Sequence, residues 1–160
     1  LGLELGWKWK AGDRVKKKAI DKAEPAALFV DRNLQLLKPG GRLLIVVPDG
    51  ILCNSGDAYI REYIMGSKDE ETGEFLGGKA ILKAVVSLPT ETFAISGTGA
   101  KTSFIYLQKK KHASEKQRPV FMGVAEHVGY MKKGKAEVPD PNGNDLVEIA
   151  SAYVRRPDNA

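Results

Sequence analysis

The sequence predicts a layered α/β fold, in which helices pack on a sheet of short strands. Three observations lead to this prediction. Helical and strand-like patterns alternate over residues 24–109. The strand-like segments are short, continuously apolar and mostly β-branched, as in the sheets of α/β proteins. No internal repeat is present that would indicate a solenoid or propeller.

Composition excludes several other classes of protein. The 160 residues are 42% hydrophobic, and 25 Lys+Arg against 20 Asp+Glu give a net charge of +5. This apolar content is too high for intrinsic disorder, and the single Cys53 excludes a disulfide scaffold. The apolar runs are far shorter than the roughly 20 residues of a membrane span. Because the start has no initiator Met and no signal-peptide pattern, we expect a fragment or processed chain from a reducing compartment.

The first element expected after the N-terminus is a helix. Residues 1–23 show no clean period and predict a loop or extended basic arm containing Trp7 and Trp9. Pro25 suits the first turn of a helix, because its missing N–H would be unpaired there anyway. The helix should end at residues 38–41, where Gly40 suits a left-handed cap. Its apolar face is expected to comprise Ala26, Phe29, Val30, Leu34 and Leu37.

A strand, a helix and a polar segment are expected next. Residues 43–47 read as a strand buried on both faces, which ends in a turn at 48–50. Ser55 or Asp57 should cap a second helix. Its apolar stripe is Tyr59, Ile60, Tyr63 and Ile64. Residues 66–78 are polar and glycine-rich, which predicts an exposed loop or a small hairpin.

Two more strands frame a long loop. The strand at 80–88 ends at Pro89, and the next begins at Thr102. The twelve residues 90–101 between them are too many for a tight hairpin, which favours a function for this loop.

The last fifty residues are expected to form an extension. A strand is predicted at 120–128, with residues 129–130 turning out of it, and a second turn at 140–143. Asn144 or Asp145 should cap a final amphipathic helix. Its apolar positions are Leu146, Ile149, Ala150 and Tyr153.

Most motifs that would indicate catalysis are missing. His112 and His127 have no Cys or paired carboxylates nearby, which disfavours a zinc site, and Cys53 has no base beside it. The segment 97–102 resembles a phosphate-binding loop, but Ala100 replaces the required glycine and a strand follows. ATP binding through Lys101 is therefore not expected.

Two features leave a functional and a structural interpretation open. Phe93 lies just past the carboxyl end of a strand, where open α/β sheets hold their sites, but the residues alone favour a hydrophobic plug under the loop. Lysines cluster at residues 8–18, 109–111 and 132–135. Such clusters are typical of phosphate binding, and they also occur on ordinary solvated surfaces.

The order of these segments resembles the N-6 adenine DNA methylase family, the modification subunits of type I restriction systems. The resemblance rests on ALFVDRNLQLLKPGGR at 27–42, LLIVVPDGIL at 43–52, SLPTETF at 87–93 and GTGAKTS at 97–103. It is close over residues 24–109 and looser through 129–130 and 144–146.

The resemblance implies the C-terminal part of a seven-stranded, Rossmann-like sheet of an S-adenosylmethionine-dependent methyltransferase. Residues 42–47, 80–88 and 102–109 would be the fifth, sixth and antiparallel seventh strands. The family's cofactor loop and its Asn-Pro-Pro-Phe motif are both missing from the sequence, so we assign no catalytic, cofactor-binding or metal residue. We expect the chain alone to be inactive.

The implied organisation has three parts. Residues 1–23 form a basic arm following the missing catalytic motif, 24–109 the C-terminal half of the methyltransferase domain, and 110–160 a strand-turn-helix extension.

The resemblance also implies roles for residues. Phe93 would stack on a flipped adenine, and Pro48 and Asp49 would line its site. DNA phosphate contacts would come from Lys101, Lys16, Lys17 and Lys18.

Partners and location follow from the same resemblance. The partners would be DNA, a specificity subunit and a nuclease subunit, and no membrane is expected among them. The protein would lie in the cytoplasm of a bacterium or archaeon. An exposed sheet edge could also pair two copies as a homodimer. The alternative is a non-catalytic methyltransferase-like module for DNA binding or assembly.

Overall fold

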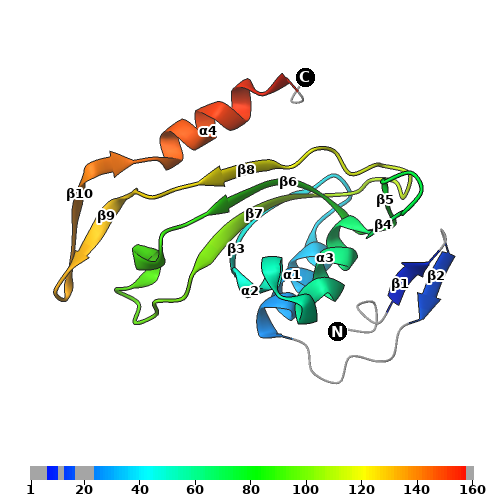
Figure 1. Ribbon diagram of the computed structural model, residues 1–160, viewed down its shortest axis with the longest axis horizontal. Coiled ribbons are helices and arrows are strands. Elements are labelled where there is room, and N and C mark those ends of the chain that lie inside the picture. The colour runs from blue at the N-terminus through cyan, green and yellow to red at the C-terminus, as the bar shows by residue number, and fades with distance from the viewer. Residues whose placement is uncertain (1–6, 11–12, 17–23, 158–160) are drawn as a thin grey trace.

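A mixed four-stranded sheet forms the centre of the molecule (Figure 1). The computed structural model describes residues 7–10, 13–16 and 24–157. The sheet has the order β3-β7-β6-β8, and its strands are β3 (Arg42–Pro48), β6 (Ala80–Ser87), β7 (Thr102–Lys109) and β8 (Phe121–Val124). β7 is antiparallel to both β3 and β6, whereas β8 is parallel to β6. The predicted α/β class is therefore confirmed, including the antiparallel strand at 102–109.

Helices lie on both sides of this sheet. α1 (Pro25–Leu36), α2 (Gly50–Cys53) and α3 (Ala58–Met65) lie on one side, and α4 (Leu146–Arg155) lies on the other (Figure 1). Pro25 begins α1, as its fixed φ favours. Gly40, with φ of 77°, begins the turn into β3.

The larger core cluster lies between α1, α3 and the sheet. It includes Val30 and Leu34 from α1, Ile60 from α3, and Ile105 and Leu107 from β7. Each fully buried Leu or Ile contributes about 1.5–3 kcal/mol. The smaller cluster lies on the other face, where β6 meets α4 and the start of the C-terminal extension. Its buried members are Val86, Leu88, Ala125 and Val128.

Two expectations about burial were wrong. Phe29 is 62% exposed, because α1 buries a polar side chain, Asp31, where an apolar face was expected. The Tyr63 hydroxyl donates a hydrogen bond to Asp31 Oδ1 at 2.6 Å and so joins α3 to α1, and Gln35 Nε2 donates to Asp31 Oδ2 at 2.9 Å. Together these two bonds satisfy the buried carboxylate. β3 is buried on one face only, since Leu44 and Val46 are 63% and 45% exposed on the side that carries α4.

Two short hairpins lie near one end of the sheet. β1 (Trp7–Lys10) and β2 (Asp13–Lys16) pair antiparallel, so these residues form a hairpin where a loop or extended arm was expected. Lys16 ends β2, and Lys17 and Lys18 lie outside the described residues. β4 (Ser67–Lys68) and β5 (Phe75–Leu76) form the small hairpin that residues 66–78 predicted as one of two alternatives.

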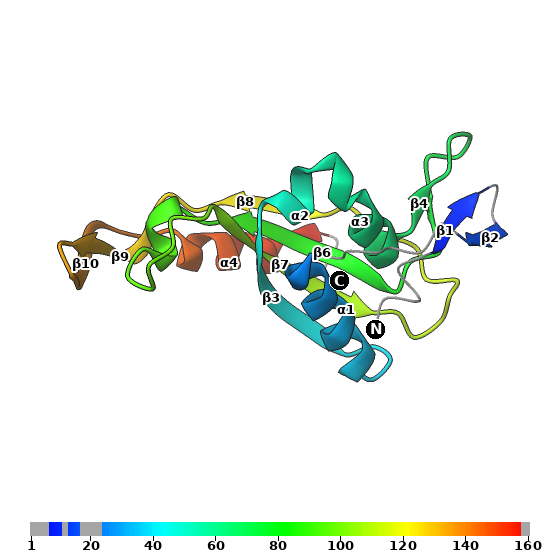
Figure 2. The ribbon, with the colours of Figure 1, turned by 90° about the horizontal axis from the view of Figure 1, so that it is seen from below.

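The C-terminal extension differs from the expected single strand at 120–128. β8 stops at Val124, and a new hairpin follows, formed by β9 (Val128–Lys133) and β10 (Ala136–Asn144). The chain leaves the sheet at this point because the Asp145 carboxylate accepts hydrogen bonds from the backbone N–H groups of Glu126 and His127, both at 2.8 Å. This hairpin lies at the opposite end of the molecule from β1–β2 (Figure 2).

The turns of the extension lie at other positions than predicted. The hairpin turn contains Gly134, with φ of 65°, while the turn predicted at 140–143 is an irregularity within β10, between Pro139 and Asn144. Asn144 does help to begin α4, because its Oδ1 accepts a hydrogen bond from Leu146 N at 3.0 Å.

Candidate functional site

Three strand ends meet at one edge of the sheet. β3 and β6 both finish there, and the antiparallel β7 begins there. The Asp49 N–H donates to the Lys101 carbonyl at 3.1 Å, and the Leu88 N–H donates to the Thr102 carbonyl at 3.0 Å. These bonds bring Pro48, Asp49 and Lys101 together, although about fifty residues separate them in sequence.

Asp49 is fixed by a partner that sequence reasoning missed. Ser103 Oγ donates a hydrogen bond to Asp49 Oδ1 at 2.7 Å, and Ser103 is buried. Bonds to charged groups are shorter and stronger than neutral ones, so this contact orients the half-buried carboxylate. Pro48, directly before Asp49, pairs with Thr102 in register and is exposed.

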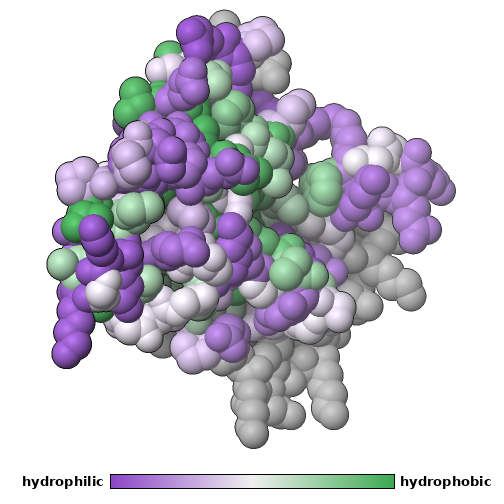
Figure 3. Space-filling view, turned by 60° about the vertical axis from the view of Figure 1, so that its left-hand side comes forward, coloured by the Kyte–Doolittle hydropathy of each residue, from purple (hydrophilic) through white to green (hydrophobic). Residues whose placement is uncertain are grey.

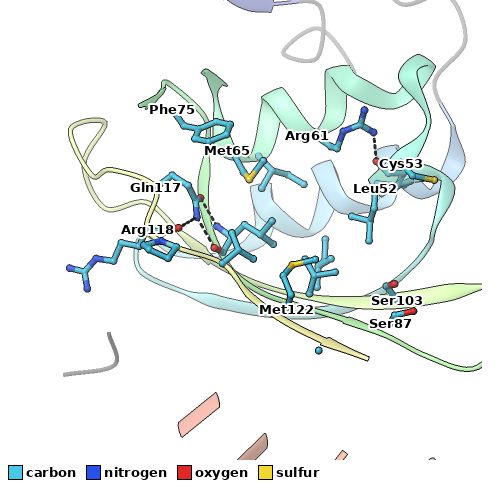
Figure 4. Close-up of a pocket in the computed structure, with 18 of the residues that line it drawn as sticks. Leu52, Cys53, Arg61, Met65, Phe75, Ser87, Ser103, Gln117, Arg118 and Met122 are labelled. Carbon is cyan, nitrogen blue, oxygen red and sulfur yellow. Dashed lines mark hydrogen bonds between the residues drawn. The ribbon is translucent and has the colours of Figure 1, made fainter. Parts of the chain in front are cut away.

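A cavity of about 830 Å³ opens beside this carboxylate, on the face of the sheet that carries α2 and α3. Ser87 and Ser103 lie at one end of it, next to each other on neighbouring strands (Figure 4). Further along, its walls are largely apolar, with Leu52, Met65 and Met122 pointing into it. The volume of the cavity and its mostly apolar lining fall within the range of pockets that bind small molecules through a few fixed polar groups.

Two polar side chains in the cavity wall have structural partners. The Arg61 guanidinium donates to the carbonyls of Ile51 and Asn54, at 2.7 and 2.8 Å, and so joins α3 to α2. Gln117 exchanges two hydrogen bonds with the backbone of Leu82, which holds the segment before β8 along β6.

Phe93 lies on the other face of the sheet. Residues Thr90–Phe93 form a 3₁₀ helix after β6, and the half-buried Phe93 ring packs against the smaller core cluster. Phe93 does not line the cavity beside Asp49. The structure therefore places the predicted stacking residue and the predicted lining residues on opposite faces, linked through residues 88 and 101.

The lysine clusters have unequal surroundings. Lys101 Nζ donates to the Leu88 carbonyl at 2.5 Å. Lys109 Nζ donates to the Leu37 carbonyl at 2.8 Å, and Lys110 Nζ to the Gly77 carbonyl, so two members of the 109–111 cluster stabilise the fold. Burial lowers the pKa of Lys110. The third cluster, at 132–135, is exposed at the turn of the β9–β10 hairpin.

His127 has a carboxylate partner, contrary to expectation. Its Nδ1 lies 2.8 Å from Asp140 Oδ2, and the Asp140 side chain is only 6% exposed. The hydrogen bond to Asp140 raises the pKa of His127. The irregularity in β10 brings these two residues together, and no spacing rule in the sequence reveals it.

Other candidate centres lack the necessary neighbours. Within residues 7–10, 13–16 and 24–157, no three His, Cys, Asp or Glu side chains gather as metal ligands.

In that same part of the chain, no helix is long and apolar enough to span a membrane. Residues 97–100 lead into a strand, so the phosphate-loop geometry does not form.

Comparison with known proteins gives a family and a fold. The sequence model of the N-6 DNA methylase family matches residues 5–159. No curated protein sequence matches the chain. Its fold is similar to that of a Listeria monocytogenes protein described as a class I S-adenosylmethionine-dependent methyltransferase. The TM-score is 0.53 and the identity 18%, over 86% of this chain and 35% of that one.

Two further structures are similar at 25% identity. One is the M protein of the type I restriction enzyme EcoKI, with a TM-score of 0.46 over 71% of this chain and 21% of that chain. The other is a structure of a type I restriction-modification complex, with a TM-score of 0.39 over 68% of this chain and 17% of that chain. The chain thus spans about a third or less of the length of the structures it resembles.

Proposed function

The chain belongs to the N-6 DNA methylase family, and from this membership we propose that it forms part of a DNA adenine-N6 methyltransferase subunit of a type I restriction-modification system. Such an enzyme transfers a methyl group from S-adenosylmethionine to the amino group of an adenine that has left the duplex stack. The contribution of this chain would be one side of the target-base site.

The described residues do not fit a site for the cofactor itself. A nucleotide-type cofactor is commonly held by a glycine-rich turn that leads from a strand into a helix. Here the paired glycines at 40–41 and 77–78, and those at 97–99, lead into strands. Gly50 does lead from β3 into a helix, but it stands alone and α2 has only four residues. Cofactor binding and the Asn-Pro-Pro-Phe chemistry would therefore belong to residues outside this sequence, and we expect the chain alone to transfer no methyl group.

One observation carries the target-base proposal: the ends of β3, β6 and β7 are hydrogen-bonded into a single edge. In open α/β sheets, ligands bind outside the carboxyl ends of strands, which is where Asp49 and the 89–101 loop lie. The base would lie beyond the strand ends, where Pro48 and Asp49 would line the site from one face of the sheet and the exposed part of the Phe93 ring would stack on the base from the other. Stacking of this kind contributes about 1–3 kcal/mol.

Phe93 variants separate stacking from packing. In the complete methyltransferase that contains this sequence, Phe93→Leu keeps an apolar side chain against the smaller cluster but removes the aromatic face. We expect about a 5- to 150-fold loss in binding of DNA with an extrahelical adenine, from the 1–3 kcal/mol of stacking. Phe93→Tyr, the matched control, should bind normally. Equal binding by Phe93→Leu and wild type would show that Phe93 is only a plug.

The second candidate is a non-catalytic methyltransferase-like module for DNA binding or assembly. The missing Asn-Pro-Pro-Phe motif favours it, as do the exposed apolar residues Leu44 and Val46 on the sheet. Tritium transfer from labelled S-adenosylmethionine to adenine by the complete protein would exclude this candidate. Its absence, with DNA binding intact, would exclude the methyltransferase proposal.

The proposed partners are DNA, a specificity subunit and a nuclease subunit, in the bacterial or archaeal cytoplasm where the DNA lies. β3 and β8 are the outer strands of the described sheet, so a homodimer through one of these edges is a further proposal. A monomeric mass in sedimentation would contradict the homodimer alone.

A further inference from the structure

The β9–β10 hairpin and the loop that carries Phe93 lie side by side at one end of the sheet (Figures 1 and 2). Two hydrogen bonds join them. The Tyr130 hydroxyl donates to the Thr92 carbonyl at 2.8 Å, and Lys132 Nζ donates to the Ala94 carbonyl at 3.1 Å. The hairpin therefore contacts the residues on both sides of Phe93.

The base of the hairpin is fixed to the rest of the fold. Val128, at the start of β9, is buried in the same cluster that Phe93 packs against. The His127–Asp140 contact at 2.8 Å and the two backbone bonds to Asp145 close the base on the other side. Both strands of the hairpin are therefore anchored at its base. Because Tyr130 and Lys132 also bond to the loop, a displacement of the turn would be transmitted to residues 90–97.

The turn of the hairpin is a cationic projection. Lys132, Lys133 and Lys135 are all exposed around Gly134, where a side chain would meet nothing within 4 Å. Glu137, opposite Lys132, is the one acidic residue among positions 131–139. Hydrophilic side chains project from this end of the molecule (Figure 3). A compact positive projection beside a proposed base site complements the DNA phosphate backbone.

We infer that the β9–β10 hairpin is a DNA-contacting arm, whose turn lysines bind backbone phosphates beside the target adenine while Tyr130 holds the Phe93 loop. This inference rests on the proposed function and deepens it. From Tyr130 to Lys133 the strand extends about 10 Å, at about 3.4 Å per residue. DNA rises about 3.4 Å per base pair. This reach spans about three base pairs if β9 runs along the duplex, so the phosphates contacted should lie within about three base pairs of the adenine.

Salt dependence of binding tests the arm. The complete methyltransferase is titrated with a fluorescent duplex carrying its target adenine, at several salt concentrations, and compared with Lys133→Gln/Lys135→Gln. Each phosphate contact contributes about 0.9 to the slope of log affinity against log salt, so the double variant should lose about 1.8. The control, Lys38→Gln/Lys68→Gln, removes two exposed lysines elsewhere and should leave the slope unchanged. An unchanged slope for the turn variant would overturn the inference.

Methylphosphonate duplexes test where the arm lies. Neutral linkages within about three base pairs of the adenine should weaken wild-type binding but not binding by the turn variant. The same linkages placed a full helical turn away should weaken both proteins equally. Equal weakening at the near position would contradict this placement of the arm.

Tyr130→Phe tests the link between arm and loop. It removes only the hydroxyl that bonds the Thr92 carbonyl. With 2-aminopurine as the target base, we expect the equilibrium constant for base extrusion to fall about 2- to 10-fold, as for one lost hydrogen bond, while the salt slope stays unchanged. Unchanged extrusion would overturn the link. If the wild type extrudes and methylates no adenine, the proposed function fails, and the salt slopes still decide whether the arm binds DNA.

Discussion

Ser103→Ala should weaken the edge of the sheet where the candidate site lies. It removes the hydroxyl that donates to Asp49 Oδ1 at 2.7 Å. A hydrogen bond to a charged group contributes about 1.5–3 kcal/mol, and because Asp49 is only half-buried we expect about 1–2 kcal/mol. For a chain of this size, that loss lowers the melting temperature by about 2–8 °C.

The neighbouring serine provides the control. Ser87 faces the same cavity and pairs with Ser103 across the strands, yet no hydrogen bond is described for its side chain. Urea unfolding of Ser103→Ala, Ser87→Ala, Asp49→Ala and the 49/103 double variant gives the coupling directly. We expect coupling of about 1 kcal/mol between residues 49 and 103 and little change for Ser87→Ala, because independent sites are additive within about 0.5 kcal/mol. Equal losses at both serines, or no coupling, would refute the argument.

Three further changes should have measurable effects. Tyr63→Phe leaves Asp31 Oδ1 without its 2.6 Å donor, while Gln35 still donates to Oδ2, and calorimetry should show a loss of about 1.5–3 kcal/mol. The Asp140 hydrogen bond raises the pKa of His127. The stability that this contact gives the folded state is therefore present below the ordinary histidine pKa of about 6.5 and is lost as pH rises through the raised value. His127→Gln should flatten this pH dependence of the free energy of unfolding, measured in unfolding curves at different pH. Gly66→Ala puts a Cβ 2.1 Å from a β5 carbonyl oxygen at φ of 97°, and hydrogen exchange should show the β4–β5 hairpin opening.

Much of the central fold follows from local patterns. The strands predicted at 43–47, at 80–88 and from Thr102 correspond to β3, β6 and β7, because short β-branched runs bounded by Pro and Gly rarely form anything but strands. The helix beginning at Pro25 was predicted for a similar reason, since its start and stop signals are local.

What the sequence did not reveal depends on contacts between distant residues. Phe29 was expected inside, because an apolar side chain is a better candidate for burial than Asp31. Two donors make the buried carboxylate acceptable: the Gln35 amide, one turn later in α1, and the Tyr63 hydroxyl, 32 residues away. The end of β8 likewise depends on the Asp145 carboxylate, 18 residues beyond His127, and neither helix nor strand periodicity reports such a bond.

The candidate site shows the same division. Its location could be predicted, since loops at the carboxyl ends of strands hold the ligands of α/β sheets. The partners within it could not, because Ser103 looks like any strand residue until β3 pairs with β7. The stacking role proposed for Phe93 comes only from the resemblance to the N-6 adenine DNA methylase family, whereas its neighbours in the structure are those of a half-buried core side chain.

Lys101 shows how these neighbours limit the assignment of function. Its carbonyl accepts the Asp49 N–H and its ammonium donates to the Leu88 carbonyl, so one residue joins the ends of β3 and β6. A phosphate contact by Lys101 stays a prediction, and it would require the ammonium to leave the Leu88 carbonyl or to share its protons with a phosphate. Lys133 and Lys135 have no such bond described and are exposed. The proposed phosphate contacts are therefore expected first from the β9–β10 hairpin, while Lys101 holds the strand ends together.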